Sequence, residues 1–260
     1  MRSVVERDVP MPGAGEIRVR MHVVGVIPAD AGSGRTTGVP GQDGAGVVDA
    51  VGPDVPGPAV GDLVWVWGAQ GTAQEYVVLP RRHVVPLPPG VSFDVGASLG
   101  VPALTAHRAL TMAGDEPRRL VPGALTGRVV LVPGAAGAVE NAAIQLASWA
   151  GAHVVVTVAS PAEAELARAA GADHVRLPEP DGGGGLSEPP DIVVDVAAAG
   201  SMTEEQRDEA VASVSAAVAA HRLRAGAGAG LPVTRFPLAE AAAAVETAAG
   251  QAAGRVLIDI

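Results

Sequence analysis

The stretch RVVLVPGAAGAVENAAIQLASW, residues 128–149, decides the fold of this chain. Its apolar run Val129–Val132 predicts a buried parallel strand, and a glycine-rich turn at 134–138 follows it. Apolar residues then recur at helical spacing as far as Ala147. A strand, a glycine turn and a helix in this order open a dinucleotide-binding βαβ unit, in which a pyrophosphate rests on the free N–H groups of the helix N-terminus. The stretch therefore predicts an α/β fold with a parallel sheet.

The glycine fingerprint of this turn is incomplete. With Gly134 and Gly137 as its first two glycines, the third position is occupied by Glu140. The third glycine normally lets helix and strand pack closely, and a glutamate adds bulk and a negative charge there. Two readings stay open: Glu140 opposes a pyrophosphate, or it turns to solvent and only favours the helix dipole.

Composition limits the classes of function. The chain has 260 residues, of which 48% are hydrophobic and 18% are charged, so it can bury a sizeable core. Its net charge of -10 argues against nucleic acid and anionic membrane as partners. It has no cysteine, which excludes disulfides and thiolate chemistry. We find no signal-peptide pattern and no apolar run that could span a bilayer, so we expect a cytoplasmic protein.

The first part of the chain is typical of an all-β domain. Polar and apolar residues alternate at 16–23, and further strands are predicted at 45–51, 62–67 and 73–78. Prolines and glycines interrupt these strands at short intervals, as in a small β barrel. From Val101 the spacing of apolar residues becomes helical.

The second part alternates strands and helices and then stops doing so. After the opening unit we predict a strand at 153–158, a helix at 161–170 ended by Gly171, and strands at 173–176 and 191–196. A long helix at 203–221 follows, with a capping box of Thr203 and Gln206, and then a helix at 239–249 and a strand at 255–260. The parallel sheet thus has four predicted strands, whereas a full doubly wound sheet has about six.

The chain resembles the quinone oxidoreductase branch of the medium-chain dehydrogenase/reductase superfamily. The motifs that carry the resemblance are GVIPAD (25–30), GQDGAGVV (41–48), VGDLVW (60–65), GTAQEYVVLP (71–80), VPALTAHRAL (101–110), VLVPGAAGAVENAAIQLA (130–147), ARAAGADHV (167–175), DIVVDV (191–196), RFPLAEAAAAVE (235–246) and GRVLIDI (254–260). The resemblance implies a GroES-like β-barrel domain, a Rossmann domain, and NADPH and substrate between them. We expect the first at 1–103 with 232–260, and a truncated Rossmann domain at 104–231.

Four departures from the family concern the NADPH site. Glu140 replaces the third glycine, and Ile27 replaces the polar residue that lines the nicotinamide pocket. The segment after Val196 is too short for the strand that holds the nicotinamide. Ser160 is the one group near the ribose phosphate that could help, and Glu163 would oppose it. We therefore expect a fold that has lost NADPH binding, with Gly134, Gly137 and Ser160 as the remnant of the site.

The resemblance also suggests residues for a substrate pocket. Its predicted lining residues are Ile27, Asp30, Gln42, Trp65, Trp67 and Thr105, and its predicted acid–base groups are His107, Asp43 and Glu140. Histidine suits proton transfer near neutral pH. Each has a structural alternative: Asp30 and Asp43 could bond the backbone, the tryptophans could be core, and His107 could be a satisfied core histidine. The histidines show no metal-ligand spacing, so no metal is expected.

Three hypotheses about function follow. The first is a cofactor-independent enzyme that carries out cyclisation, isomerisation or dehydration of a carbonyl or polyene small molecule. The second is an NADPH-dependent quinone or enone reductase, with the cofactor bound in an altered way. The third is a non-catalytic partner protein with an apolar surface patch. A homodimer is possible under each of them.

Overall fold

The computed structural model describes residues 4–32, 38–112, 118–178, 189–250 and 253–260. The chain divides into two compact units. Unit 1 comprises residues 1–101 and 233–260, and unit 2 comprises residues 102–232. The domain limits expected from the sequence lie within two residues of these divisions.

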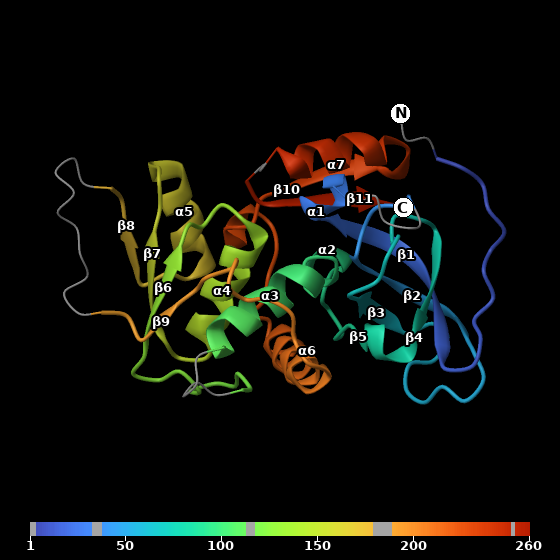
Figure 1. Cartoon of the computed structure of the whole chain (residues 1–260), viewed down its shortest axis with the longest axis horizontal. Coiled ribbons are helices and arrows are strands. Elements are labelled where there is room, and N and C mark those ends of the chain that lie inside the picture. The colour runs from blue at the N-terminus through green and yellow to red at the C-terminus, as the bar shows by residue number, and fades with distance from the viewer. Residues whose placement is uncertain (1–3, 33–37, 113–117, 179–188, 251–252) are drawn as a thin grey trace. The chain divides into compact units, whose positions relative to one another are not determined.

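Unit 1 is built mainly of strands (Figure 1). Its elements are β1 (Glu16–Val26), α1 (Ala29–Gly32), β2 (Asp43–Val51), β3 (Leu63–Val66), β4 (Tyr76–Pro80), the 3-10 turn η1 (Arg81–His83), β5 (Val84–Pro86), α2 (Phe93–Gly96), β10 (Val233–Pro237), η3 (Leu238–Glu240), α7 (Ala241–Ala249) and β11 (Arg255–Asp259).

The seven strands of this sheet run in the order β10-β11-β1-β2-β3-β5, and β4 also pairs with β1. All neighbours are antiparallel except β10 and β11, which are parallel. The alternation predicted in β1 is confirmed, because Ile17, Val19 and Met21 are buried in the core. The C-terminal strand β11 therefore completes the sheet that the N-terminal residues begin.

Unit 2 alternates strands with helices. Its elements are α3 (Gly100–Thr111, which begins at the end of unit 1), β6 (Val129–Pro133), α4 (Ala138–Trp149), β7 (His153–Thr157), α5 (Pro161–Ala170), β8 (His174–Arg176), β9 (Ile192–Val193), α6 (Glu204–Ala219) and η2 (Ala227–Ala229).

The four strands described in unit 2 form one parallel sheet in the order β8-β7-β6-β9. Among the described residues they correspond to the first four positions of the doubly wound order 3-2-1-4-5-6. Helix α4 packs against β6 and β7, and α5 packs against α4 and β8. Val130, Val132, Val154 and Val156 of β6 and β7 are fully buried. The predicted α/β class and the Rossmann-like parallel sheet are therefore confirmed.

The predicted helix ends are also confirmed. Gly171 follows α5 in the left-handed conformation, with φ +108°, where a residue with a side chain would be strained. The hydroxyl of Thr203 accepts the Gln206 N–H, and the Gln206 side chain accepts the Thr203 N–H, so the capping box of α6 is complete.

The strands predicted from the sequence differ from those of the structure in three places. The strand expected at 191–196 is limited to Ile192–Val193, because Asp195 accepts the Ala198 N–H in a turn that ends it. The short β5 was not predicted. Nor was β10, which follows a glycine-rich stretch and gains its pairing from the distant β11. In the described part of the chain, no helix is both long and apolar enough to cross a membrane.

Candidate functional site

The turn between β6 and α4 contains two glycines with different backbone conformations. Gly134 adopts φ +94°, a left-handed conformation that glycine tolerates, and its N–H donates to the carbonyl of Thr157 over 2.7 Å. Gly137 is the N-cap of α4 in extended conformation, and no side chain caps this helix. The N-cap of this twelve-residue helix therefore contributes no side-chain hydrogen bond to its first N–H groups.

The side chain of Glu140 occupies this turn. A Cβ built on Gly137 would lie 3.2 Å from the carboxyl carbon of Glu140 and would collide with its Oε2. A Cβ built on Gly134 would lie 3.9 Å from its Cγ. The half-buried carboxylate is thus folded back over the turn, where a pyrophosphate would be expected to rest.

Ser160 is engaged in capping the next helix. Its hydroxyl accepts the N–H of Glu163 over 3.3 Å, and Ser160 is the N-cap of α5. The Glu163 carboxylate in turn accepts the N–H of Ala159 over 3.2 Å. Both side chains therefore accept main-chain N–H groups at the start of α5.

The sheet brings one basic side chain to this edge that the sequence reasoning missed. Arg176 ends β8 and is the register partner of Thr157, the last residue of β7. Its carbonyl accepts the Val158 N–H over 2.9 Å. The parallel pairing of β7 with β8 was the feature that could have identified it, because the carboxyl ends of parallel strands meet at one edge.

Asp43 lies in the interior of unit 1. Its side chain is fully buried, and Oδ2 accepts a hydrogen bond from Nη2 of Arg255 over 3.1 Å. Oδ1 accepts the N–H of Val101 over 2.8 Å. Burial raises the pKa of Asp43 to about 6, although the guanidinium of Arg255 opposes this rise. These contacts favour the structural role for Asp43 over the catalytic one.

The other polar residues predicted for the pocket in unit 1 bind backbone. The Asp30 carboxylate accepts the N–H of Ile27 over 2.9 Å and the N–H of Gly41 over 3.3 Å. Asp30 is 3% exposed, whereas Ile27 and Gln42 are half-buried. The Gln42 carbonyl accepts the N–H of Ala69. Asp30 therefore links the end of β1 to the loop before β2.

Trp65 and Trp67 are both core residues in unit 1. Trp65 is fully buried, and its indole N–H has no hydrogen-bond partner among the described residues. Trp67 is 6% exposed, and its ring lies 4.7 Å from that of His83. This burial favours core packing over the wall of an open pocket.

His107 is hydrogen-bonded inside unit 2. Its Nε2 lies 3.0 Å from Oγ of Ser213, which also accepts the Leu120 N–H and donates to the Glu209 carbonyl. Burial, assisted by Arg108, lowers the pKa of His107 to about 4. Thr105 is half-buried two positions earlier on α3, so the two side chains do not face each other. The geometry favours the structural role for His107.

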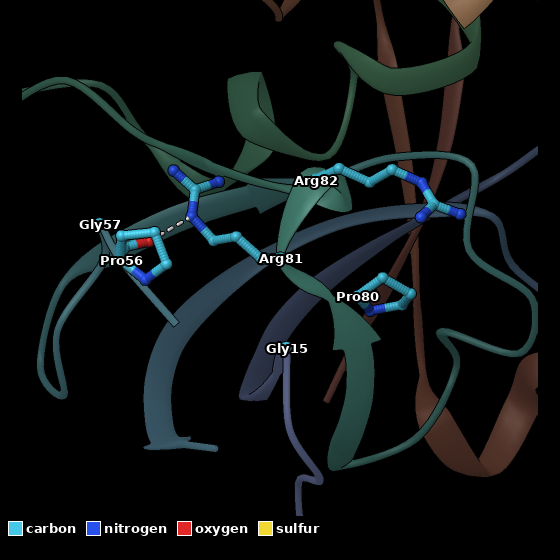
Figure 2. A pocket seen from close by; sticks show the side chains of 6 residues that line it. All are labelled: Gly15, Pro56, Gly57, Pro80, Arg81 and Arg82. Carbon is cyan, nitrogen blue, oxygen red and sulfur yellow. Dashed lines mark hydrogen bonds between the residues drawn. The ribbon is translucent and has the colours of Figure 1, made fainter. Parts of the chain in front are cut away.

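Three surface recesses have none of the predicted pocket residues in their walls. The first, of about 560 Å³, is an open recess in unit 1 beside Arg81 and Arg82 (Figure 2). Arg81 donates to the carbonyls of Pro56 and Val84, so its guanidinium fastens the neighbouring loops. The second, of about 660 Å³, lies in unit 1 between the segment 4–10 and Tyr76. The third, of about 410 Å³, lies in unit 2.

Among the described residues, no group of three His, Asp or Glu side chains is placed to hold a metal ion.

The residues present fit NADPH poorly. The carboxylate of Glu140 lies over the glycine turn. The Ser160 hydroxyl accepts the N–H of Glu163, and the Glu163 carboxylate accepts the N–H of Ala159, so both side chains are already engaged at the start of α5. The described strands of the sheet end at β9, so the fifth position, which would carry the nicotinamide, has no strand among them.

Comparisons with known proteins agree with this architecture. Residues 13–89 match the family model of the alcohol dehydrogenase GroES-like domain. A quinone oxidoreductase of Pseudomonas aeruginosa is 34% identical over 169 residues, which cover 62% of this chain and 50% of that protein. The spectinabilin polyketide synthase system protein NorB of Streptomyces orinoci is 42% identical over 138 residues, 53% of this chain and 6% of that protein.

The structure is similar to solved structures over nearly all of its length. A mycobacterial quinone oxidoreductase aligns over 98% of this chain and 94% of its own, with a TM-score of 0.74 and 25% identity. In the sequence comparisons the chain spans about half the length of the quinone oxidoreductases that it matches. The chain therefore contains a GroES-like domain, resembles quinone oxidoreductases over the aligned segments, and has the fold of these solved structures.

Proposed function

We propose that this chain is an enzyme that works without NADPH and catalyses a non-redox reaction on a carbonyl or polyene small molecule. The observation that carries the proposal is the Glu140 carboxylate folded over Gly137. A pyrophosphate at this turn would meet a like charge, and two unit charges about 4 Å apart repel by roughly 4 kcal/mol at an effective dielectric near 20. A penalty of that size would weaken binding about a thousandfold.

Two further observations support the proposal. The described strands of the parallel sheet stop at the fourth position of the doubly wound order, before the strand that faces a nicotinamide. The hydroxyl of Ser160, the predicted contact for the ribose phosphate, is the N-cap of α5. These two features concern the nicotinamide and the ribose phosphate, which are parts of NADPH that the glycine turn does not contact.

The accessible acid–base groups narrow the reaction class. Of the three predicted groups, Asp43 and His107 are bonded inside the two units, whereas Glu140 is half-exposed. One carboxylate is enough to isomerise an unsaturated ketone. It takes a proton from the carbon beside the carbonyl and returns it to the far carbon of the double bond, so no electrons are gained or lost. Dehydration also needs an acid for the leaving oxygen, so we favour isomerisation.

The test is an isomerisation assay without NADPH, with 3-cyclohexenone as the probe and conjugation followed by ultraviolet absorbance. We expect conversion to 2-cyclohexenone above the buffer rate, and a loss of about a hundredfold or more in Glu140→Gln. Glu163→Gln is the matched control, because Glu163 is also a half-buried carboxylate in the first turn of a helix. Equal rates for the wild type and Glu140→Gln, or no conversion, would overturn the proposal.

A second candidate is an NADPH-dependent quinone or enone reductase. It is favoured by the preserved conformation of Gly134 and by Arg176, a basic side chain beside the end of β7, near the expected place of a 2′-phosphate. The Pseudomonas relative is itself named a quinone oxidoreductase. Protein-dependent consumption of NADPH in the presence of menadione would favour this candidate over the first.

A further inference from the structure

A polar recess of about 410 Å³ lies in unit 2, where the last turns of α4, α5 and α6 meet the loop that follows α6. Its walls include Trp149 and Ser148 from α4, Gly171 from the end of α5, and His221, Arg222 and Arg224. Its size falls within the range of small-ligand sites, about 300–1,000 Å³. Helix C-termini in a βαβ unit point away from the glycine turn, so this recess is separate from the candidate nucleotide turn.

The recess has cationic groups and no carboxylate. None of its lining residues is Asp or Glu, although the chain has 28 of these and a net charge of -10. Arg222 and Arg224 are exposed, and their guanidinium groups make no hydrogen bond or ion pair with the described residues. Two unpaired arginines at one concave site are suited to an anion with several oxygens.

Main-chain donors bond part of the carbonyls at these helix ends. The Ala150 N–H donates to the carbonyls of Leu146 and Ser148 in α4, and the Gly171 N–H donates to those of Ala167 and Arg168 in α5. The last carbonyls of α6 accept the N–H groups of Ala220, His221 and Arg222. Several carbonyls near these helix ends are thus bonded to main-chain N–H groups, and neither guanidinium group donates to a carbonyl of the described residues.

Two buried amide side chains of α4 fix the backbone of the loop that carries the arginines. The Gln145 side chain accepts the N–H of Arg224 over 3.0 Å and donates to its carbonyl over 3.1 Å. Gln145 also donates to Asn141, which donates to the carbonyl of Ala229 over 2.8 Å. Both amide side chains are buried, so the backbone of the loop is fixed before any ligand arrives.

His221 has an unusual conformation at the same place. It follows the C-cap of α6 with φ +53°, a position where helices commonly carry glycine. Its exposed imidazole adds a third hydrogen-bond donor to the recess. The recess beside Arg81 differs, since there the guanidinium is already bonded to two carbonyls (Figure 2).

We propose that this recess binds a small molecule that carries both a phosphate group and a planar ring. The guanidinium groups of Arg222 and Arg224 bind the phosphate oxygens, and the Ser148 hydroxyl is a further donor. The half-buried ring of Trp149 forms the apolar wall against the planar ring. The proposed site uses no residue of the glycine turn, so it does not depend on the reaction proposed above.

The test uses the intrinsic fluorescence of the full chain, with adenosine 5′-monophosphate as the probe. Trp65 and Trp67 are buried in unit 1, so Trp149 is the tryptophan that a ligand in this recess can quench. We expect saturable quenching that Trp149→Phe removes. We also expect Arg222→Gln and Arg224→Gln each to weaken binding by roughly tenfold or more, and the double variant to abolish it.

Two controls locate the site. Arg82→Gln removes an exposed arginine from unit 1 and leaves the affinity unchanged. Adenosine without phosphate binds at least about tenfold more weakly. Unchanged affinity in the double arginine variant, with circular dichroism showing an intact fold, would overturn the proposal. So would the absence of binding at about 10 mM probe.

Discussion

Nη2 of Arg255 and Oδ2 of Asp43 lie 3.1 Å apart, and their side chains are 2% and 0% exposed. Arg255 begins β11, and Asp43 begins β2. The same guanidinium donates to the carbonyls of Val26 and Ala97. One ion pair therefore joins residues 212 positions apart and fastens the C-terminal strand into unit 1.

We predict that Arg255→Met lowers the free energy of unfolding by about 3–5 kcal/mol, because it leaves Asp43 buried without its cation. Urea unfolding followed by circular dichroism measures the change. Arg118→Gln is the control: Arg118 and Glu205 are each 75% exposed, and loss of such a pair costs under about 1 kcal/mol. Equal losses in the two variants would contradict the structural role of the buried pair.

The second prediction concerns acid stability through His107, whose pKa is lowered to about 4 by burial. The unfolded chain binds a proton at His107 near pH 6.5, whereas the folded chain does so only near pH 4. Stability from this group is therefore complete above about pH 6.5 and is lost as the pH falls, by roughly 3 kcal/mol at pH 4.

The measurement compares the wild type with His107→Gln across this range. Asp43 acts in the opposite direction, because its pKa is raised to about 6 and protonation favours the folded state. Both proteins contain Asp43, so its contribution cancels in the difference. We expect the stability gap between wild type and variant to narrow from pH 7 to pH 4, and a constant gap would show that His107 is not buried in its neutral form.

The third prediction separates two roles of Ser160. Ser160 is the N-cap of α5, so Ser160→Ala should lower the free energy of unfolding by about 1 kcal/mol. Thr203→Ala, which removes the N-cap of α6, should cost a similar amount. Urea unfolding measures both. If Ser160→Ala instead kept full stability and weakened coenzyme binding, Ser160 would be a phosphate ligand.

The fourth prediction concerns the charge at the glycine turn. Glu140→Gln removes the charge and keeps the size, so affinity for inorganic pyrophosphate, measured by calorimetry, should rise at least about tenfold. The same change should lower stability by about 0.3–1 kcal/mol, since a carboxylate favours the helix N-terminus. Glu204→Gln in the first turn of α6 should show the stability loss alone.

Local patterns predicted most of the secondary structure. The apolar run at 129–132 and the helical spacing after it correspond to β6 and α4, and the Thr203–Gln206 pattern marks the start of α6. These features depend on residues a few positions apart. The strand β10 depends instead on parallel pairing with β11, which no local pattern encodes.

The site was less predictable for the same reason. The sequence identifies Glu140 at the turn, but only the folded chain shows its carboxylate turned back over Gly137 rather than into solvent. The distant partner of Asp43, Arg255, and the hydrogen bond of His107 to Ser213 also lie outside any local pattern. Spacing alone could not separate these buried groups from accessible catalytic ones.

The central claim, that the turn from Gly134 to Glu140 no longer holds the coenzyme, is tested most directly by calorimetric titration of the wild-type chain with NADPH. We predict no saturable binding up to about 1 mM. A dissociation constant in the micromolar range with one NADPH bound per chain would contradict the account.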